Sequence, residues 1–198
     1  MDADEVRVKD FLESKGLTPE RFTKQEVHAG KTPDFRVMLN GELLFFCEVK
    51  SSQEDRFLDV HLENVEGGQL IGGPRNDPIF NRLASDIHKA ISQFDAVNGA
   101  WEVPNVLAIV NHDEMCGFND LLAVVTGNFY VENGSAAPIY RQFSHGRIQE
   151  EKRKIDLFIW LDDHKPHRLL FSQTNECQHT KLLAVFGLSQ DDITQIGS

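Results

Sequence analysis

Residues Asp34 to Lys50 read DFRVMLNGELLFFCEVK, with two runs of β-favouring residues on either side of Asn40-Gly41. An Asn-Gly pair in this position is a strong signal for a β-hairpin, because both residues tolerate the positive φ angles of tight hairpin turns. We therefore predict a hairpin over this stretch and place it at the centre of the fold.

The register of the hairpin decides which side chains share a face. A two-residue loop of Asn40-Gly41 pairs residues whose numbers sum to 81, which mixes apolar and charged side chains on one face. A three-residue loop of Leu39-Asn40-Gly41, with Gly41 as a left-handed bulge, gives pairs that sum to 80. We expect the second register, because one face is then wholly apolar: Phe35, Val37, Leu43, Phe45, Cys47 and Val49. The opposite face carries Asp34, Arg36, Met38, Leu44, Phe46, Glu48 and Lys50.

Helices and further strands are expected around the hairpin. From Phe80 to Phe94, apolar residues recur at the i, i+3, i+4 and i+7 spacing of an amphipathic helix. Together these elements predict an α/β or α+β fold with a central mixed β-sheet flanked by helices. The other expected elements are a helix over 6–12, strands over 22–27, 106–110 and 155–161, a strand near 169–172, a short helix over 119–125 and a helix or strand over 182–186. A long loop is expected over 51–78, with Asn76 or Asp77 capping the helix that follows.

Length and composition fit one soluble globular domain spanning residues 1–198. Hydrophobic residues make up 40% of the chain and charged residues 26%. No apolar run approaches the ~18 residues of a membrane span, so we expect no membrane association. Three scattered cysteines, Cys47, Cys116 and Cys177, match no zinc spacing and favour a reducing, cytoplasmic compartment. The net charge of −11 argues against a surface that binds nucleic acid as a whole, but it leaves a local basic groove open.

The expected register brings Asp34, Glu48 and Lys50 together at one end of one hairpin face. Two neighbouring carboxylates repel each other unless a cation or a proton intervenes, and Mg²⁺ suits oxygen ligands of this kind. The carbonyl of Val49 adds a ligand if the strand end is open, and the Lys50 ammonium can steer water or stabilise charge on a phosphate. The alternative interpretation is a pair of solvated surface charges, since Glu-X-Lys is common at strand ends.

These residues, Pro33-Asp34, thirteen further residues and then Glu48-Val49-Lys50, resemble the motif of the PD-(D/E)XK nuclease superfamily. The resemblance implies a restriction-endonuclease-like core over about 5–111, with a C-terminal β-containing extension over about 112–198. It implies that Asp34 and Glu48 bind Mg²⁺, with Mn²⁺ as a substitute, and that Lys50 helps to activate water. It also implies an acidic residue from the first helix, for which Glu5 is the best match and Asp2, Asp4 and Glu13 are rivals.

Substrate contacts are expected from Ser51 after the motif and from Lys89 or Gln93 in the following helix. Residues 93–97 lack the tyrosine of the Gln-X-X-X-Tyr pattern, so the exonuclease-like subgroup is unsupported. His112, His164 and His167 show no zinc spacing and are interpreted as surface or loop residues.

We therefore expect a Mg²⁺-dependent nuclease that acts on DNA. Two alternatives stay open: a catalytically inactive protein of the same fold that binds protein or nucleic acid, and a phosphohydrolase of small nucleotides. A homodimer also stays open.

Overall fold

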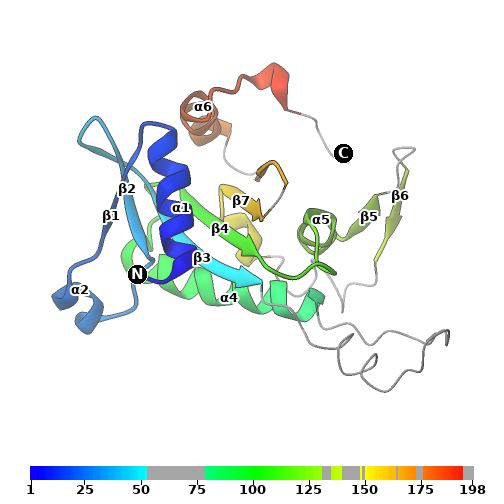
Figure 1. Cartoon of the computed structure of the whole chain (residues 1–198), viewed down its shortest axis with the longest axis horizontal. Coiled ribbons are helices and arrows are strands. Elements are labelled where there is room, and N and C mark those ends of the chain that lie inside the picture. Colours follow the sequence, from blue (N-terminus) through cyan, green and yellow to red (C-terminus); the bar gives the residue numbers. More distant parts are fainter. Residues whose placement is uncertain are drawn as a thin grey trace.

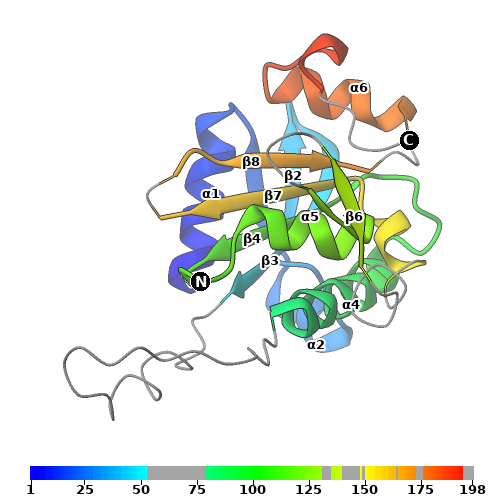
Figure 2. The ribbon, with the colours of Figure 1, turned by 90° about the vertical axis from the view of Figure 1, so that its right-hand side faces the viewer.

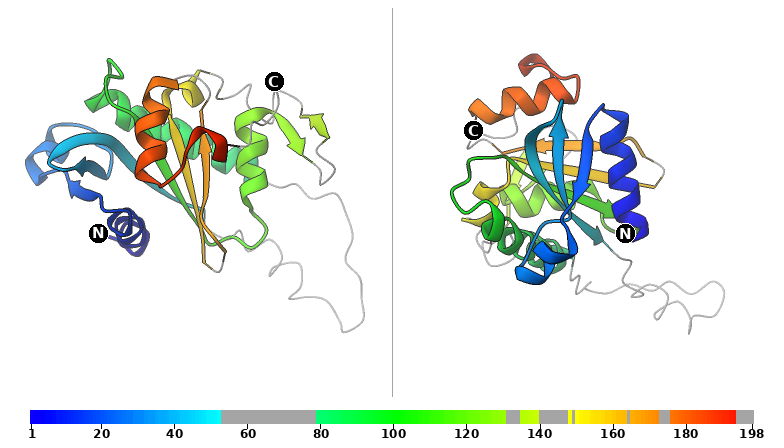
Figure 3. Two further views of the ribbon diagram at one scale, coloured as in Figure 1. Left: turned by 90° about the horizontal axis from the view of Figure 1, so that it is seen from above. Right: turned by 90° about the vertical axis from the view of Figure 1, so that its left-hand side faces the viewer.

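The computed structural model describes residues 1–52, 79–130, 135–139, 148, 150–163, 165–172 and 176–193, with the side chains of 176–178 left aside. A six-stranded mixed sheet with the order β1-β2-β3-β4-β7-β8 lies at its centre (Figure 1). The strands of this sheet are β1 (Thr18–Arg21), β2 (Phe35–Leu39), β3 (Glu42–Ser52), β4 (Asn105–Asn111), β7 (Leu157–Asp162) and β8 (Arg168–Phe171). A separate pair, β5 (Asn128–Tyr130) and β6 (Ala136–Pro138), lies at the far end of the molecule from β1 and β2 (Figure 3).

Helices cover both faces of the main sheet (Figure 2), which confirms the predicted α/β architecture. Helices α4 (Ile79–Val97) and α5 (Phe118–Thr126) pack on one face, and α1 (Ala3–Ser14) and α6 (Glu176–Val185) pack on the other. The shorter helices are α2 (Lys24–Ala29), η3 (Glu151–Lys154) and η4 (Gln190–Asp192). Among the described helices, none is long and apolar enough to cross a bilayer.

Strands β3, β4 and β7 run parallel in the middle of the sheet. Every residue of β4 is buried, because α4 and α5 cover one face of the strand and the α1 side covers the other. Strands that run parallel end at the same edge of the sheet. Ser52, Asn111 and Asp162 therefore lie side by side in the ladder, and the carboxyl ends of three strands meet at one place.

The hairpin of β2 and β3 has the two-residue turn that the prediction set aside, together with a bulge that neither predicted register included. Its turn has two residues, Asn40 and Gly41, with φ values of 53° and 85°, as a primed hairpin turn requires. Leu44 is then a bulge, because Val37 pairs with Phe45 while Met38 pairs with Leu43. The predicted three-residue loop and its register were thus wrong, and Leu43, placed on the apolar face, is 37% exposed.

The predicted segregation of the faces is nevertheless confirmed beyond the bulge. The extra residue shifts the pairing by one, so that odd-numbered residues again face odd-numbered residues. Phe35, Val37, Phe45, Cys47 and Val49 are buried together on the α1 side, whereas Phe46 is buried on the α4 side.

Three further predictions need correction. Residues 22–27 do not form a strand, because Thr23 caps α2 in a capping box with Glu26, and the edge strand β1 lies before them. Strand β3 continues through Ser52, so the predicted loop is wrong at residues 51 and 52. The rest of that loop, with the caps at Asn76 and Asp77, lies outside the described residues, as does His164. The predicted C-terminal extension over about 112–198 is also part of the main sheet, because it contributes β7 and β8 to it.

Candidate functional site

Asp34 and Glu48 meet where β2 begins and β3 continues past it. Phe35 pairs with Cys47, so the residues that precede and follow this pair, Asp34 and Glu48, lie at the same level of the sheet. Asp34 Oδ2 accepts a hydrogen bond of 2.8 Å from the backbone N–H of Val49. In an extended strand the N–H and C=O of one residue point to the same side, so the Val49 carbonyl also faces the edge at which Asp34 lies.

Glu48 is the buried member of this group, with 1% of its surface exposed. Its Oε1 accepts a hydrogen bond from Lys50 Nζ. Its Oε2 is buried and receives no hydrogen bond from the described residues, which leaves it to be satisfied by a proton shared with Asp34 or by a cation. Burial, followed by the negative charge of Asp34, raises the pKa of Glu48 from 4.5 to about 8. The Lys50 ammonium acts in the opposite direction but does not offset these two effects.

The side chain of Lys50, a residue of β3, contacts both β3 and α4. Its Nζ donates to Glu48 and, at 3.2 Å, to Oε1 of Gln93. The amide of Gln93 donates in turn to the carbonyl of Thr32 at 3.1 Å, two residues before Asp34. Gln93, predicted as a substrate contact, therefore orients Lys50 and ties α4 to the segment that carries Asp34.

Glu5 lies at the same end of the sheet but is engaged elsewhere. Its carboxylate accepts a hydrogen bond from the backbone N–H of Asp2 and forms a 2.8 Å ion pair with Arg21. Among these acidic residues it is Asp4 that contacts β3, because its carboxylate accepts a hydrogen bond from Ser51 Oγ. Of the two other rivals, Asp2 caps α1 and Glu13 pairs with Lys9 at 2.6 Å.

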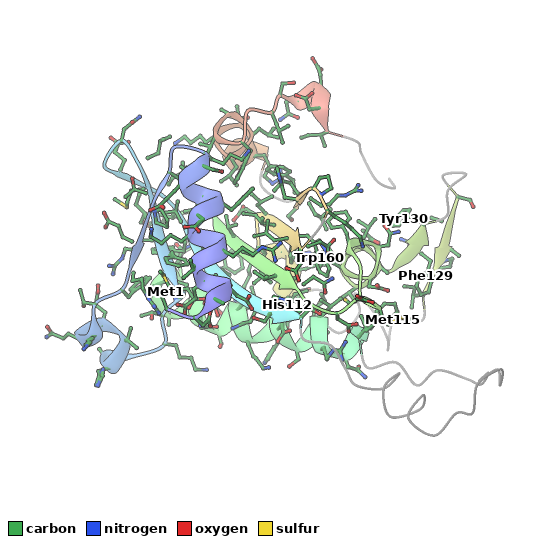
Figure 4. All side chains as sticks on the ribbon, in the orientation of Figure 1. Met1, His112, Met115, Phe129, Tyr130 and Trp160 are labelled. Carbon is green, nitrogen blue, oxygen red and sulfur yellow. The ribbon has the colours of Figure 1, made fainter. Side chains whose placement is uncertain are left out.

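His112, interpreted from the sequence as a surface or loop residue, follows β4 and reaches across to α1 (Figure 4). Its Nε2 lies 2.8 Å from Asp4 Oδ1, and its Nδ1 lies 3.6 Å from a carboxylate oxygen of Asp163. Arg7 binds the same Asp163. This network fastens α1 to the carboxyl ends of β4 and β7. Asp4 and His112 are 108 residues apart in the chain, so no local sequence pattern could have predicted their contact.

A polar pocket of about 370 Å³ opens between the end of β3 and the first half of α4. Sequence reasoning had named two of its residues, Ser51 and Lys89, and missed the others. A signal was present, because Arg82, Asp86, Lys89 and Gln93 follow each other at spacings of four, three and four residues, which places them on one side of a helix. The pocket is lined by Ser51, Ser52, Asn81, Arg82, Ser85, Asp86 and Lys89.

The oxygens at the β2–β3 edge fit a divalent cation with few protein ligands. In the part of the chain that the structure describes, no three His, Cys, Asp or Glu side chains converge in a way that could hold a metal ion. Neither Asp4 nor Glu5 therefore completes a trio with Asp34 and Glu48. The available donors are two carboxylates and the Val49 carbonyl, and Mg²⁺ commonly takes one or two protein carboxylates and keeps several waters. The unpartnered Oε2 of Glu48 has the chemistry of such a ligand.

Comparison of the chain with protein-family models, with curated proteins and with solved structures found no match in any of the three. The function of the site therefore has to be argued from its own residues.

Proposed function

We propose that this protein is a Mg²⁺-dependent nuclease that hydrolyses phosphodiester bonds in DNA. In this proposal Asp34, Glu48 and the Val49 carbonyl hold the cation, and Lys50 acts on water and on the scissile phosphate. One observation carries the proposal: a buried carboxylate oxygen of Glu48 lacks a hydrogen-bond partner among the described residues and belongs to a carboxylate beside Asp34. Buried polar groups are rarely left unpaired, and those that are often mark a functional site.

The roles of the residues follow from their contacts. A divalent cation at this edge would supply Lewis-acid chemistry, by stabilising negative charge on phosphate and lowering the pKa of water. Glu48, whose pKa is raised to about 8, would have to give up its proton to serve as a ligand. Lys50, oriented by Glu48 and Gln93, directs a positive charge to the place at which negative charge develops on phosphate. Glu5 acts indirectly, because its ion pair with Arg21 holds the start of α1 against β1.

The order of the elements supports the nuclease assignment. Helix α1, strands β1 to β3, helix α4 and strand β4 follow each other as the resemblance to the PD-(D/E)XK superfamily implies for a restriction-endonuclease-like core. Asp34 and Glu48 also lie together at one end of the hairpin, where the alternation of the two strands predicts them.

DNA is the proposed substrate in spite of the acidic chain. Lys50 contacts Glu48, and Arg82 and Lys89 line the neighbouring pocket, which supplies local cations for phosphate within a net charge of −11. The two rival functions are a module without catalytic activity and a phosphohydrolase of small nucleotides.

One assay separates the three functions. Purified protein is incubated with plasmid, single- and double-stranded oligonucleotides and free nucleotides, in Mg²⁺, Mn²⁺ or EDTA. We expect metal-dependent cleavage of DNA that falls by about 100-fold or more in Asp34→Ala and Lys50→Ala. Glu42→Ala is the matched control, because Glu42 is an exposed carboxylate at the opposite end of β3.

Each other outcome has a definite meaning. Cleavage that persists in both site variants contradicts the assigned roles. Hydrolysis of free nucleotides alone indicates the phosphohydrolase. The absence of both cleavage and divalent-cation binding indicates the module without catalytic activity.

A further inference from the structure

The pocket between β3 and α4 has an unusual lining, in that all seven of the described residues that line it carry polar side chains. Arg82 and Lys89 carry positive charge and donate hydrogen bonds, Lys89 to Asp86 at 3.4 Å, whereas the Asp86 carboxyl group accepts them. The serines can do both. Inorganic phosphate alone would meet the Asp86 carboxyl group. The lining suits a ligand with an anionic part and an N–H donor part.

The pocket adjoins the proposed catalytic group. Ser51 and Ser52, which form one wall, directly follow Lys50 on β3. The other wall belongs to α4, the helix whose Gln93 accepts a hydrogen bond of 3.2 Å from Lys50. A ligand in the pocket would therefore lie beside the phosphate on which Lys50 is proposed to act.

The size of the pocket limits what it can hold. Its volume of about 370 Å³ is at the lower end of the range of small-molecule sites. One nucleotide fits such a volume, whereas a base pair within a stacked duplex does not. Arg82 is also fixed in place, because it forms an ion pair with Asp113, a carboxylate whose side chain is 2% exposed.

We infer that this pocket is a subsite for one unpaired nucleotide next to the scissile phosphate. Its phosphate lies toward Lys89 and Arg82, and the N–H groups of its base point toward Asp86. A base can enter such a pocket only after it leaves the helical stack, which is least costly in single-stranded or frayed DNA. The inference rests on the proposed function for its place in the reaction and deepens it, because it names the substrate class as unpaired DNA.

Binding without catalysis tests the subsite directly. The affinity of the full chain for a short single-stranded oligonucleotide and for its duplex is measured in EDTA by fluorescence anisotropy. Deoxynucleoside monophosphates and inorganic phosphate serve as competitors. We expect the single strand to bind at least about tenfold more tightly than the duplex and to be displaced by a mononucleotide more readily than by phosphate.

Two variants and one control locate the binding. Ser85→Tyr fills the pocket from an exposed helical position, and Lys89→Gln removes one of its cations; each should weaken binding of the single strand by about tenfold. His88→Tyr adds the same tyrosine to the same helix outside the pocket, on a side chain that is 71% exposed and contacts Glu151, and it should bind as the wild type does. Equal thermal stability of the two tyrosine variants shows that folding is not the cause.

The subsite and the proposed function can fail separately. Equal affinity for single strand and duplex, displacement by phosphate as efficient as by a mononucleotide, or unchanged affinity in both Ser85→Tyr and Lys89→Gln would overturn the subsite. If the expected binding is found but no DNA is cleaved with Mg²⁺ or Mn²⁺, the subsite stands and the nuclease assignment falls.

Discussion

Replacing Glu48 by glutamine should change how the stability of the metal-free protein depends on pH. Glu48 is 1% exposed, lies beside Asp34 and has a pKa raised from 4.5 to about 8, with burial as the largest cause. Glutamine has nearly the same shape and can still accept a hydrogen bond from Lys50, but it cannot ionise. The substitution therefore isolates the free energy that ionisation of this one carboxyl group costs.

The sign follows from linkage between proton binding and folding. Because the folded protein binds the Glu48 proton more tightly than the unfolded chain does, this carboxyl group contributes stability that is fully present below about pH 4.5 and is lost as the pH rises through 8. Each pKa unit is worth about 1.4 kcal/mol, so the loss between pH 5 and pH 8 amounts to about 3 kcal/mol. Glu48→Gln should gain stability relative to wild type by this amount over the same interval.

Chemical denaturation in EDTA at several pH values measures the difference between the two proteins. Adding Mg²⁺ then separates the effect of the cation on stability from the effect of the proton. Because the cation needs ionised carboxylates, it should stabilise the wild type most at high pH and have little effect on the variant. Glu42→Gln, at an exposed carboxylate of the same strand, is the matched control.

Two results would refute this reasoning. A difference in unfolding free energy between Glu48→Gln and wild type that stays constant from pH 5 to pH 8 would show that Glu48 is ionised throughout. A difference that grows toward acidic pH would mean that the ion pair with Lys50 outweighs the effects of burial and of Asp34.

Three further substitutions test how the site is held in place. Asn111→Ala removes hydrogen bonds of 2.8 Å to the carbonyl of Cys116 and 2.7 Å to Asp162. Denaturant unfolding should show that the free energy of unfolding falls by about 2 to 4 kcal/mol. A decrease below about 1 kcal/mol would contradict this role of Asn111. Gly41→Ala places a side chain at a φ of 85° and should cost about 1 kcal/mol, as measured by the melting temperature; an unchanged melting temperature would exclude the left-handed turn. Phe94→Ala opens a cavity in the core under α4 and should lower the free energy of unfolding by about 3 to 5 kcal/mol. The far-UV spectrum should stay native under non-denaturing conditions. A decrease below about 1 kcal/mol would contradict the burial of Phe94.

The sequence was sufficient where local periodicity carries the signal. The apolar spacing from Phe80 to Phe94 predicted α4, because a helix must turn one stripe toward the core. The alternation in residues 34–50 likewise indicated that Asp34, Glu48 and Lys50 share a face. Period-two alternation distinguishes faces but not absolute register. The sequence could therefore predict the shared face and still misplace the bulge at Leu44.

The sequence was less informative about the partners of these three residues. Glu5 and Asp4 are neighbours on α1, and the rotation of α1 on the sheet decides that Glu5 pairs with Arg21 while Asp4 reaches Ser51 and His112. That rotation is set by burial of Val8 and Leu12 against strands far away in the chain.

The charged face at the end of the hairpin was thus determined by the sequence itself, because alternate residues of two paired strands lie on the same face of the hairpin. The burial of Glu48, the orientation of Lys50 by Gln93 and the polar pocket beside them were decided only by tertiary structure. These three features arise where α4 packs on β3. The free energy that places a helix on a sheet is summed over the whole core rather than encoded in any one segment.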